Sequence, residues 1–444
     1  MGLKTQLILG IFLLGFFPAY SQSKSLISEV DLLFLQQMAK DVTEASRIYP
    51  GQKISKDFGP NQTGGTLIRP GGRSSYPAFW IRDYAMSLEA GFVKASEQKH
   101  MLLLTAKTQA DQTMPTKWGT HIPKGAIADH IRIDDSVPIY FPGTYDAADQ
   151  GKPVWGMQPP FCDAYFFIHM AHYLVIHEGQ KKVLLEKVVG IRLMDRLEMA
   201  FASVPHAEKS ALVSVTDANR GVDFGFRDAV YMTGDLCYSS LLKYQAASHL
   251  ADLQRLLGHP KESQTYFRIA QSLKKAIPER FQLPSGLLKA STGKSSQADV
   301  WATSFAHRLG ILPMHQVQKA SRTMNDAYKK GDLSLRGNIR HVLRSDDFSS
   351  QTAWEYTEAA KDSYQNGAYW GTPVAWVANL MAETRVDYAK QLIQEYIMEL
   401  REGDFRKGEG FGAPWECFNL KSAQNPVYMT SVTCPLIALK PRKK

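Results

Sequence analysis

The amino-acid sequence predicts an all-α fold built from helical hairpins, and two observations carry this prediction. Apolar residues recur at intervals of three and four in twelve blocks, whereas stretches with strand-like alternation are few. The connections between these blocks alternate between very short and long. Because short connections join antiparallel neighbouring helices, consecutive blocks are expected to form αα-hairpins.

The predicted helices occupy residues 27–46, 83–97, 99–113, 161–177, 180–200, 233–257, 260–281, 297–309, 313–330, 371–383, 385–402 and 426–439. Consecutive pairs give five hairpins, and the first block can pair with the last to complete a sixth. Short ribbons are expected at 213–215 and within 120–141. If helices alternate up and down, the six long connections all lie at one end of the bundle. Long connections in a compact domain are usually functional.

The bulk composition is that of a folded globular protein, with 44% hydrophobic and 21% charged residues among 444. The net charge is +9, but the basic residues are scattered, so no nucleic-acid partner is expected. No linker or low-complexity run divides the chain. Residues 22–444 are therefore predicted to form a single domain.

The first 21 residues have the features of a secretory signal peptide. Lys4 precedes the apolar stretch Leu7–Phe17, and the small residues Ala19 and Ser21 suit a cleavage site. No other stretch approaches the roughly 18 apolar residues of a membrane span. The protein is expected to be secreted or periplasmic.

The four cysteines are too few for a disulfide scaffold in a chain of this length. Cys417 and Cys434 could pair, or they could be free buried thiols. His169 and His172 lie three apart on one predicted helix without an evident third ligand, so a packed or exposed pair is expected. No metal or nucleotide motif occurs, and no cofactor is expected.

The stretch YPAFWIRDYAMSLEAG, residues 76–91, combines aromatic and charged residues at the start of a predicted helix. Trp80 precedes the pair Arg82 and Asp83. An aromatic ring can stack on the C–H face of a sugar while charged groups hydrogen-bond its hydroxyls. The alternative is a structural salt bridge in which Asp83 caps the helix.

The other long connections carry the same mixture of aromatic, acidic and amide side chains. It occurs in IYFPGTYD, QPPFCD, DANRGVDFGFRD, YQNGAYW and GAPWECFN. On one rim, this composition predicts a carbohydrate cleft. Its candidate binding residues, besides Trp80, Arg82 and Asp83, are Tyr145, Asp146, Asp163, Arg227, Gln365, Asn366, Tyr369, Trp370 and Trp415.

Glycosidic bond cleavage requires two carboxyl groups across the scissile bond, one of them with a raised pKa. Asp223, between apolar residues in GVDFGFRD, is the first candidate for the general acid. Asp228 is the alternative acid, in which case Asp223 is a turn residue. Glu416, flanked by aromatics in PWECF, is the candidate base; the alternative is a buried ion-pair partner.

The segment FWIRDYAMSLEAG resembles the W-x-R-D segment that opens an inner helix in glucoamylase-like enzymes. The chain is thereby similar to the six-hairpin glycosidase superfamily, without matching a single family in it. This resemblance implies an (α/α)6 barrel with long loops on one rim. It also implies that Arg82 and Asp83 hold hydroxyls of the sugar in subsite −1.

Three further segments carry the resemblance. Residues 221–258 resemble the acid-bearing loop and inner helix of the invertase and processing-glucosidase branch, and this resemblance implies that Asp223 is the acid. The usual D-N-S-P run is absent from this segment. GAPWECFN resembles the late loop that carries the base, here Glu416, and NGAYWGTPVAW resembles a segment that lines the sugar site. The reaction implied is inverting, with carboxyl groups about 6.5–9.5 Å apart.

The function expected is that of an exported, exo-acting glycoside hydrolase on an oligosaccharide or glycoconjugate. A polysaccharide lyase on the same fold is an alternative, because the net positive charge suits a uronate substrate. A second alternative is a non-catalytic glycan-binding protein.

Overall fold

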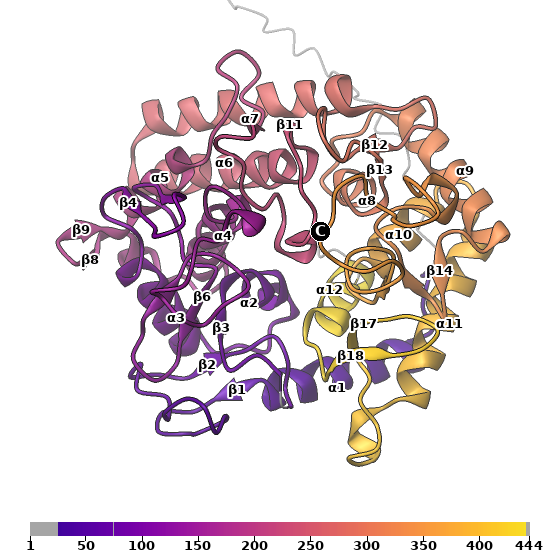
Figure 1. The fold of residues 1–444 in the computed structure, drawn as a ribbon, viewed down its shortest axis with the longest axis horizontal. Coiled ribbons are helices and arrows are strands. Elements are labelled where there is room, and N and C mark those ends of the chain that lie inside the picture. Colours follow the sequence, from indigo (N-terminus) through magenta and orange to yellow (C-terminus); the bar gives the residue numbers. More distant parts are fainter. Residues whose placement is uncertain (1–24, 74, 441–444) are drawn as a thin grey trace, which may run out of the picture.

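The computed structural model describes residues 25–73 and 75–440, and the predicted signal peptide at residues 1–21 lies outside this range. Within the described residues, twelve α-helices form a ring of two layers (Figure 1). They are α1 (Glu29–Ala45), α2 (Ile81–Ser87), α3 (Ala95–Lys107), α4 (Phe161–His177), α5 (Leu193–Ser203), α6 (Cys237–Leu257), α7 (Pro260–Phe281), α8 (Val300–Arg308), α9 (Met314–Lys330), α10 (Val374–Met381), α11 (Val386–Glu402) and α12 (Thr430–Leu439).

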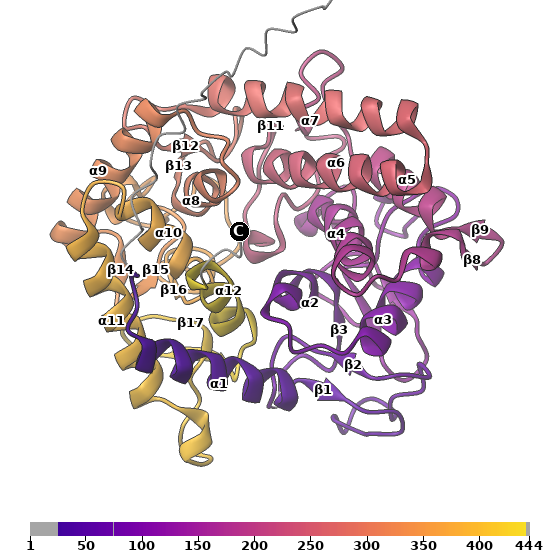
Figure 2. The same ribbon diagram turned by 180° about the vertical axis from the view of Figure 1, so that it is seen from behind.

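The even-numbered helices form the inner layer of the ring. Each contacts the next, from α2 through α4, α6, α8 and α10 to α12, and α12 contacts α2 to close the circle. The odd-numbered helices lie outside them: α7 packs on α6, α11 on α10 and α1 on α12 (Figure 2). The predicted pairing of the first helix with the last is therefore confirmed.

Burial distinguishes the two layers. On the inner helix α4, nearly every residue from Phe161 to Val175 is buried. On the outer helix α7, by contrast, the buried residues are Ala270, Leu273, Ile277 and Phe281, which recur every three or four positions. A helix that is apolar on one stripe lies at the surface with that stripe against the core, and one that is apolar all round is enclosed.

Three predicted helices differ most from those in the structure. In place of the blocks 83–97 and 99–113, the structure has α2, which ends earlier than predicted, and α3. Between these two helices Gly91 adopts a left-handed conformation with φ 82° and ends the short turn that follows α2. The block 180–200 is also shorter, because Val188 and Ile191 pair across the two-residue turn of a hairpin before α5 begins.

The all-α expectation is corrected by seven small sheets among the described residues, which lie in the connections between helices. The short ribbons expected at 213–215 and within 120–141 are among them. Their strands are β1 (Arg47–Ile48), β2 (Leu67–Ile68), β3 (Ala78–Trp80), β4 (Met114–Pro115), β5 (His121–Ile122), β6 (His130–Arg132), β7 (Pro138–Ile139), β8 (Lys187–Val188), β9 (Ile191–Arg192), β10 (Ser214–Val215), β11 (Gly234–Asp235), β12 (Leu288–Lys289), β13 (Ala298–Asp299), β14 (Ser334–Leu335), β15 (Asn338–Ile339), β16 (Tyr369–Trp370), β17 (Trp415–Phe418) and β18 (Ala423–Pro426).

Two of these sheets position residues singled out in the sequence. The antiparallel sheet β3-β6-β7 carries Trp80, and the five-stranded antiparallel sheet β14-β15-β16-β17-β18 carries Trp370 and Glu416.

Cys417 on β17 and Cys434 in α12 are free buried thiols and do not pair. None of the helices in the described part of the chain is long and apolar enough to cross a membrane.

Candidate active site

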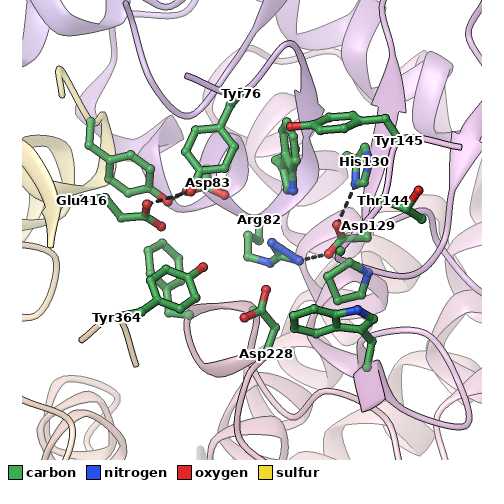
Figure 3. Close-up of a pocket in the computed structure, with 17 residues that line it drawn as sticks. Tyr76, Arg82, Asp83, Asp129, His130, Thr144, Tyr145, Asp228, Tyr364 and Glu416 are labelled. Atoms are coloured by element: carbon green, nitrogen blue, oxygen red, sulfur yellow. Dashed lines mark hydrogen bonds and ion pairs between the residues drawn. The ribbon is translucent and has the colours of Figure 1, made fainter. Parts of the chain in front are cut away.

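A cavity of about 370 Å³ opens among the connections that lead into the inner helices (Figure 3). Six of the residues predicted for the site line it: Trp80, Arg82, Asp83, Tyr145, Asp228 and Glu416. The remaining lining residues are Tyr76, Asp129, His130, Pro142, Gly143, Thr144, Trp155, Gly225, Phe226, Tyr364 and Tyr428.

Arg82, in the first turn of α2, is buried among the carboxylates of neighbouring aspartates. Its guanidinium donates a hydrogen bond to Asp129, and its Nε lies 3.7 Å from an oxygen of Asp163. Burial opposes ionisation of Asp129, but the Arg82 charge and a hydrogen bond from His130 lower its pKa. Gly225 packs so closely that a Cβ there would overlap the Arg82 side chain. Arg82 therefore has a fixed place.

Asp83 is buried beside Arg82 and does not cap the helix. The residue that precedes α2 is Trp80, and it makes no side-chain capping bond. Instead, the Tyr428 hydroxyl donates to Asp83 Oδ1 at 2.5 Å. Burial raises the pKa of Asp83 to about 6, against the opposing effects of Arg82 and Tyr428. The alternative of Asp83 as a helix cap is therefore wrong.

Trp80 forms an aromatic wall of the cavity. Its ring stacks on His130, with centroids 4.5 Å apart and planes 20° apart, and the edges of Tyr76 and Tyr145 pack against it. The Nδ1 of His130 lies 2.8 Å from Asp129. The aromatic wall and the carboxylate network are thus joined through His130.

Glu416 extends from β17 toward the cavity. The Tyr76 hydroxyl donates to its Oε2 at 2.7 Å, and the Asn425 amide donates to the same oxygen. Burial raises the pKa of Glu416 to about 7, although both hydrogen bonds oppose this by favouring the ionised form. No basic side chain among the described residues pairs with Glu416, so the alternative of a structural ion pair is wrong.

Asp228 enters the cavity from the loop before α6. Burial raises its pKa to about 7, against the lowering effect of the Arg82 charge. Its Oδ1 is buried and has no hydrogen-bond partner within the described chain. A buried carboxylate oxygen without a donor favours the protonated form.

Asp223, by contrast, does not line the cavity. Its carboxylate accepts hydrogen bonds from the backbone N–H of Ser239, at 2.9 Å, and from the Ser239 hydroxyl. It also accepts one from Arg227, which forms a second buried ion pair with Asp299. Asp223 and Arg227 therefore attach this loop to α6 and α8. Of the two acids left open by the sequence, only Asp228 lies at the cavity.

Four other predicted residues hold the loops around the cavity. Gln365 accepts the backbone N–H of Ala229 at 2.7 Å, next to Asp228, and Asn366 accepts that of Ala353, also at 2.7 Å. Tyr369 accepts a hydrogen bond from Arg344, and Trp370 is fully buried. These four residues do not line the cavity; they stabilise the loops that do.

The last three predicted residues also lie outside the cavity lining. Asp163 is buried beneath Arg82, and Asp146 is exposed and accepts the N–H of Ala148. Trp415 is partly buried against the hydrophobic core.

Sequence reasoning missed several lining residues for identifiable reasons. Asp129 and His130 form an ordinary dipeptide in the sequence, and only the pairing of β6 with β3 brings them beneath Trp80. Tyr76 and Tyr364 adopt left-handed backbone conformations, with φ 57° and 43°. Such conformations are uncommon outside glycine and cluster at functional sites. They are not visible in residue types.

No family model matches the chain, and no curated protein sequence matches it. Solved structures do share its fold. An α-L-rhamnosidase from Dictyoglumus thermophilum is 14% identical, with a TM-score of 0.52 over 92% of this chain and 37% of that one. A GH78 family rhamnosidase of Bacillus sp. GL1 is 10% identical, with a TM-score of 0.53 over 92% and 34%.

These likenesses concern the fold. Such rhamnosidases contain an (α/α)6 barrel domain and belong to the six-hairpin glycosidase superfamily. This chain spans about a third of the length of each of the two.

Proposed function

We propose that the protein is a glycoside hydrolase in which Asp228 is the general acid and Glu416 the general base. One observation carries this proposal. The two carboxyl groups come from loops far apart in the sequence and face the same aromatic-walled cavity, where burial raises the pKa of each to about 7 (Figure 3). A pair of buried carboxyl groups with raised pKa values in one cavity is typical of acid–base catalysis on glycosidic bonds. The similarity of the fold to rhamnosidases supports the proposal.

Asp228 suits the acid because its protonated form is favoured by burial and by the absence of a donor to Oδ1. In the proposed reaction its proton passes to the glycosidic oxygen, so that the departing group leaves as an alcohol.

Glu416 suits the base because two donors stabilise its ionised form. It takes a proton from a water molecule, whose oxygen then bonds to the anomeric carbon. A single displacement of this kind inverts the configuration at that carbon. Proton NMR of the first product formed distinguishes an inverted anomer from a retained one.

Arg82, Asp83 and Trp80 are proposed to hold the terminal sugar. A carboxylate and a guanidinium can bind hydroxyls, and the Trp80 ring offers a face for the apolar side of the sugar. The enzyme is proposed to be exo-acting and to remove one terminal residue. The signal peptide predicted from the sequence supports export of the enzyme.

The structure favours this function over a polysaccharide lyase. A lyase on this scaffold needs a cation to neutralise the uronate carboxylate. Arg82 is the only Lys or Arg among the described residues that line the cavity, and it already pairs with Asp129 and Asp163.

The test is single replacement of the two carboxyl groups, followed by a screen for released sugar on a panel of glycans. Asp228→Asn and Glu416→Gln should each lower kcat by about 10²- to 10⁴-fold, because each removes a proton transfer. Asp223→Asn is the matched control, since it removes a carboxylate of the same loop that lies outside the cavity; its main effect should be on stability. Full turnover by either active-site variant would reject its assignment, and binding without any hydrolysis would favour a glycan-binding protein.

A further inference from the structure

Glu416 is held through only one of its two carboxylate oxygens. Tyr76 and Asn425 both donate to Oε2, and the Asn425 amide also donates to the Tyr76 hydroxyl at 3.1 Å. The three side chains thus form a closed triangle of hydrogen bonds. No donor from the described residues reaches Oε1. That oxygen keeps its lone pairs for a molecule in the cavity.

The backbone that builds this triangle is strained. Tyr76 and Asn425 both adopt left-handed conformations, with φ 57° and 46°. Asparagine tolerates this region, but a tyrosine there is uncommon. In the β17–β18 hairpin Trp415 faces Pro426 and Cys417 faces Gln424, so Asn425 stands opposite Glu416. Strain of this kind persists where the surrounding structure holds it, and it concentrates at functional sites.

We propose that Tyr76 and Asn425 are positioning residues that fix Glu416 with Oε1 as the oxygen that deprotonates the attacking water. This inference rests on the proposed hydrolase function. In the step concerned, the proton of water passes to Oε1 and the water oxygen bonds to the anomeric carbon. The electron pair of the broken glycosidic bond goes to the leaving oxygen, which takes the proton of Asp228.

Tyr76 also connects the base Glu416 to Trp80, the ring proposed to stack on the sugar. Its ring packs edge-on against Trp80 at 4.9 Å and lies 5.9 Å from Tyr428, whose hydroxyl binds Asp83. The Tyr76 hydroxyl and the Tyr76 ring therefore have separate roles. Removal of the hydroxyl alone should affect the proton transfer and leave the packing of the Tyr76 ring against Trp80 unchanged.

The test uses two variants that remove one donor each and keep the backbone. Tyr76→Phe retains the ring, and Asn425→Gly retains the left-handed conformation. Each should lower kcat about ten- to a hundredfold, which is the loss expected for one hydrogen bond to a charged group. KM should change by less than about threefold, because ground-state binding is untouched. Tyr356→Phe, at an exposed tyrosine, is the control and should behave as the unmodified protein.

The pH profile separates positioning from a general structural role. Loss of a donor to the ionised carboxylate raises the pKa of Glu416, so the acidic limb of kcat/KM should move upward by about one pH unit. An unchanged limb and unchanged kcat in both variants would overturn the inference. A rise in KM at constant kcat would also overturn it, since it would make Tyr76 a sugar contact.

A titration without substrate keeps this inference distinct from the proposed function. In protein labelled with ¹³C at glutamate carboxyl groups, the Glu416 signal is assigned by its loss in Glu416→Gln. Its pKa should rise in both variants. If no glycan is hydrolysed, the hydrolase proposal fails whatever the titration shows. If glycans are hydrolysed but the Glu416 pKa is the same in both variants, the positioning role alone fails.

Discussion

At the residue scale, the site depends on a difference between carboxyl groups that are close in the sequence. Asp223 and Asp228 belong to the same eight-residue segment, GVDFGFRD. The two residues differ in their tertiary contacts. Ser239 and Arg227 donate hydrogen bonds to the Asp223 carboxylate, whereas one oxygen of Asp228 has no donor among the described residues. Local patterns could therefore nominate both residues but could not choose between them.

The pKa values of the pair predict a bell-shaped pH profile for kcat/KM centred near pH 7. Activity should fall on the acidic side as Glu416 is protonated, and on the alkaline side as Asp228 loses its proton; burial raises both pKa values to about 7. The apparent values belong to the coupled pair. Initial rates between pH 4 and 10 on one aryl glycoside measure the profile. A rate that stays constant from pH 4 to 6 would contradict the ionisation of Glu416 assigned here.

Gly225 supplies a second prediction at this scale. A Cβ at this position would overlap Nε of Arg82. Gly225→Ala should therefore displace Arg82, raise KM and lower the free energy of unfolding by about 1–3 kcal/mol.

Kinetics and urea denaturation of Gly225→Ala measure these effects. The matched control is Gly410→Ala, because a Cβ at Gly410 meets no atom within 4 Å and its backbone is not left-handed. Equal stability of the two variants would show that the Gly225 contact relaxes without cost.

At the element scale, periodicity predicted the long helices well and the edges of the site poorly. The bounds of α4 and α7 agree with prediction because their apolar patterns run without interruption. α2 is only seven residues long and continues as a short turn at Leu88–Ala90, which Gly91 ends. The short strands β3 and β17 that present Trp80 and Glu416 were not predicted, since a strand of three or four residues has too little alternation to detect.

A stack of histidines between α4 and α6 predicts a loss of stability in mild acid. The rings of His172 and His249 lie 3.9 Å apart, and His169 stacks on His249 at 5.2 Å. Burial lowers the pKa of His172 to about 4 and that of His249 well below its usual value. Asp252 beside His172 and Glu89 beside His169 only partly offset this effect.

Because the folded-state pKa lies below the unfolded value near 6.5, the stabilisation is present above that pH and is lost as the pH falls toward 4. His172 alone should cost about 2 kcal/mol between pH 7 and pH 5. Urea denaturation at the two pH values measures the change. His172→Phe removes this proton-binding site, so its stability should fall less over the same interval; an equal fall in both proteins would assign the acid sensitivity elsewhere.

At the scale of the whole molecule, the alternation of short and long connections predicted the ring of hairpins. Each inner helix contacts the next, and α1 meets α12 although they are separated by the full length of the chain. The sequence could not show which loop residues meet at the centre. The cavity combines segments around Trp80, Asp129, Asp228 and Glu416, and their proximity follows only from closure of the ring.

The distribution of charge predicts selectivity for neutral sugars. The chain carries a net charge of +9, yet the described residues that line the cavity include four carboxylic acids, Asp83, Asp129, Asp228 and Glu416, and one guanidinium, that of Arg82. Arg82 is already paired with Asp129 and Asp163. With Asp228 protonated as the acid, a sugar carboxylate would still meet the negative charges of Asp83, Asp129 and Glu416, which costs several kcal/mol in a buried setting, whereas hydroxyls can donate to these oxygens.

Glucose and galactose should therefore bind more tightly than glucuronate and galacturonate, which differ from them only by oxidation at C6. Saturation-transfer NMR with each pair measures relative binding without requiring hydrolysis. The discrimination should weaken in Asp83→Asn, which removes one negative charge at nearly the same volume, and should persist in Asp217→Asn, which removes an exposed carboxylate outside the cavity lining. Equal binding of the neutral and acidic sugars would mean that the four carboxyl groups carry too little charge at the pH of the measurement to exclude an anion.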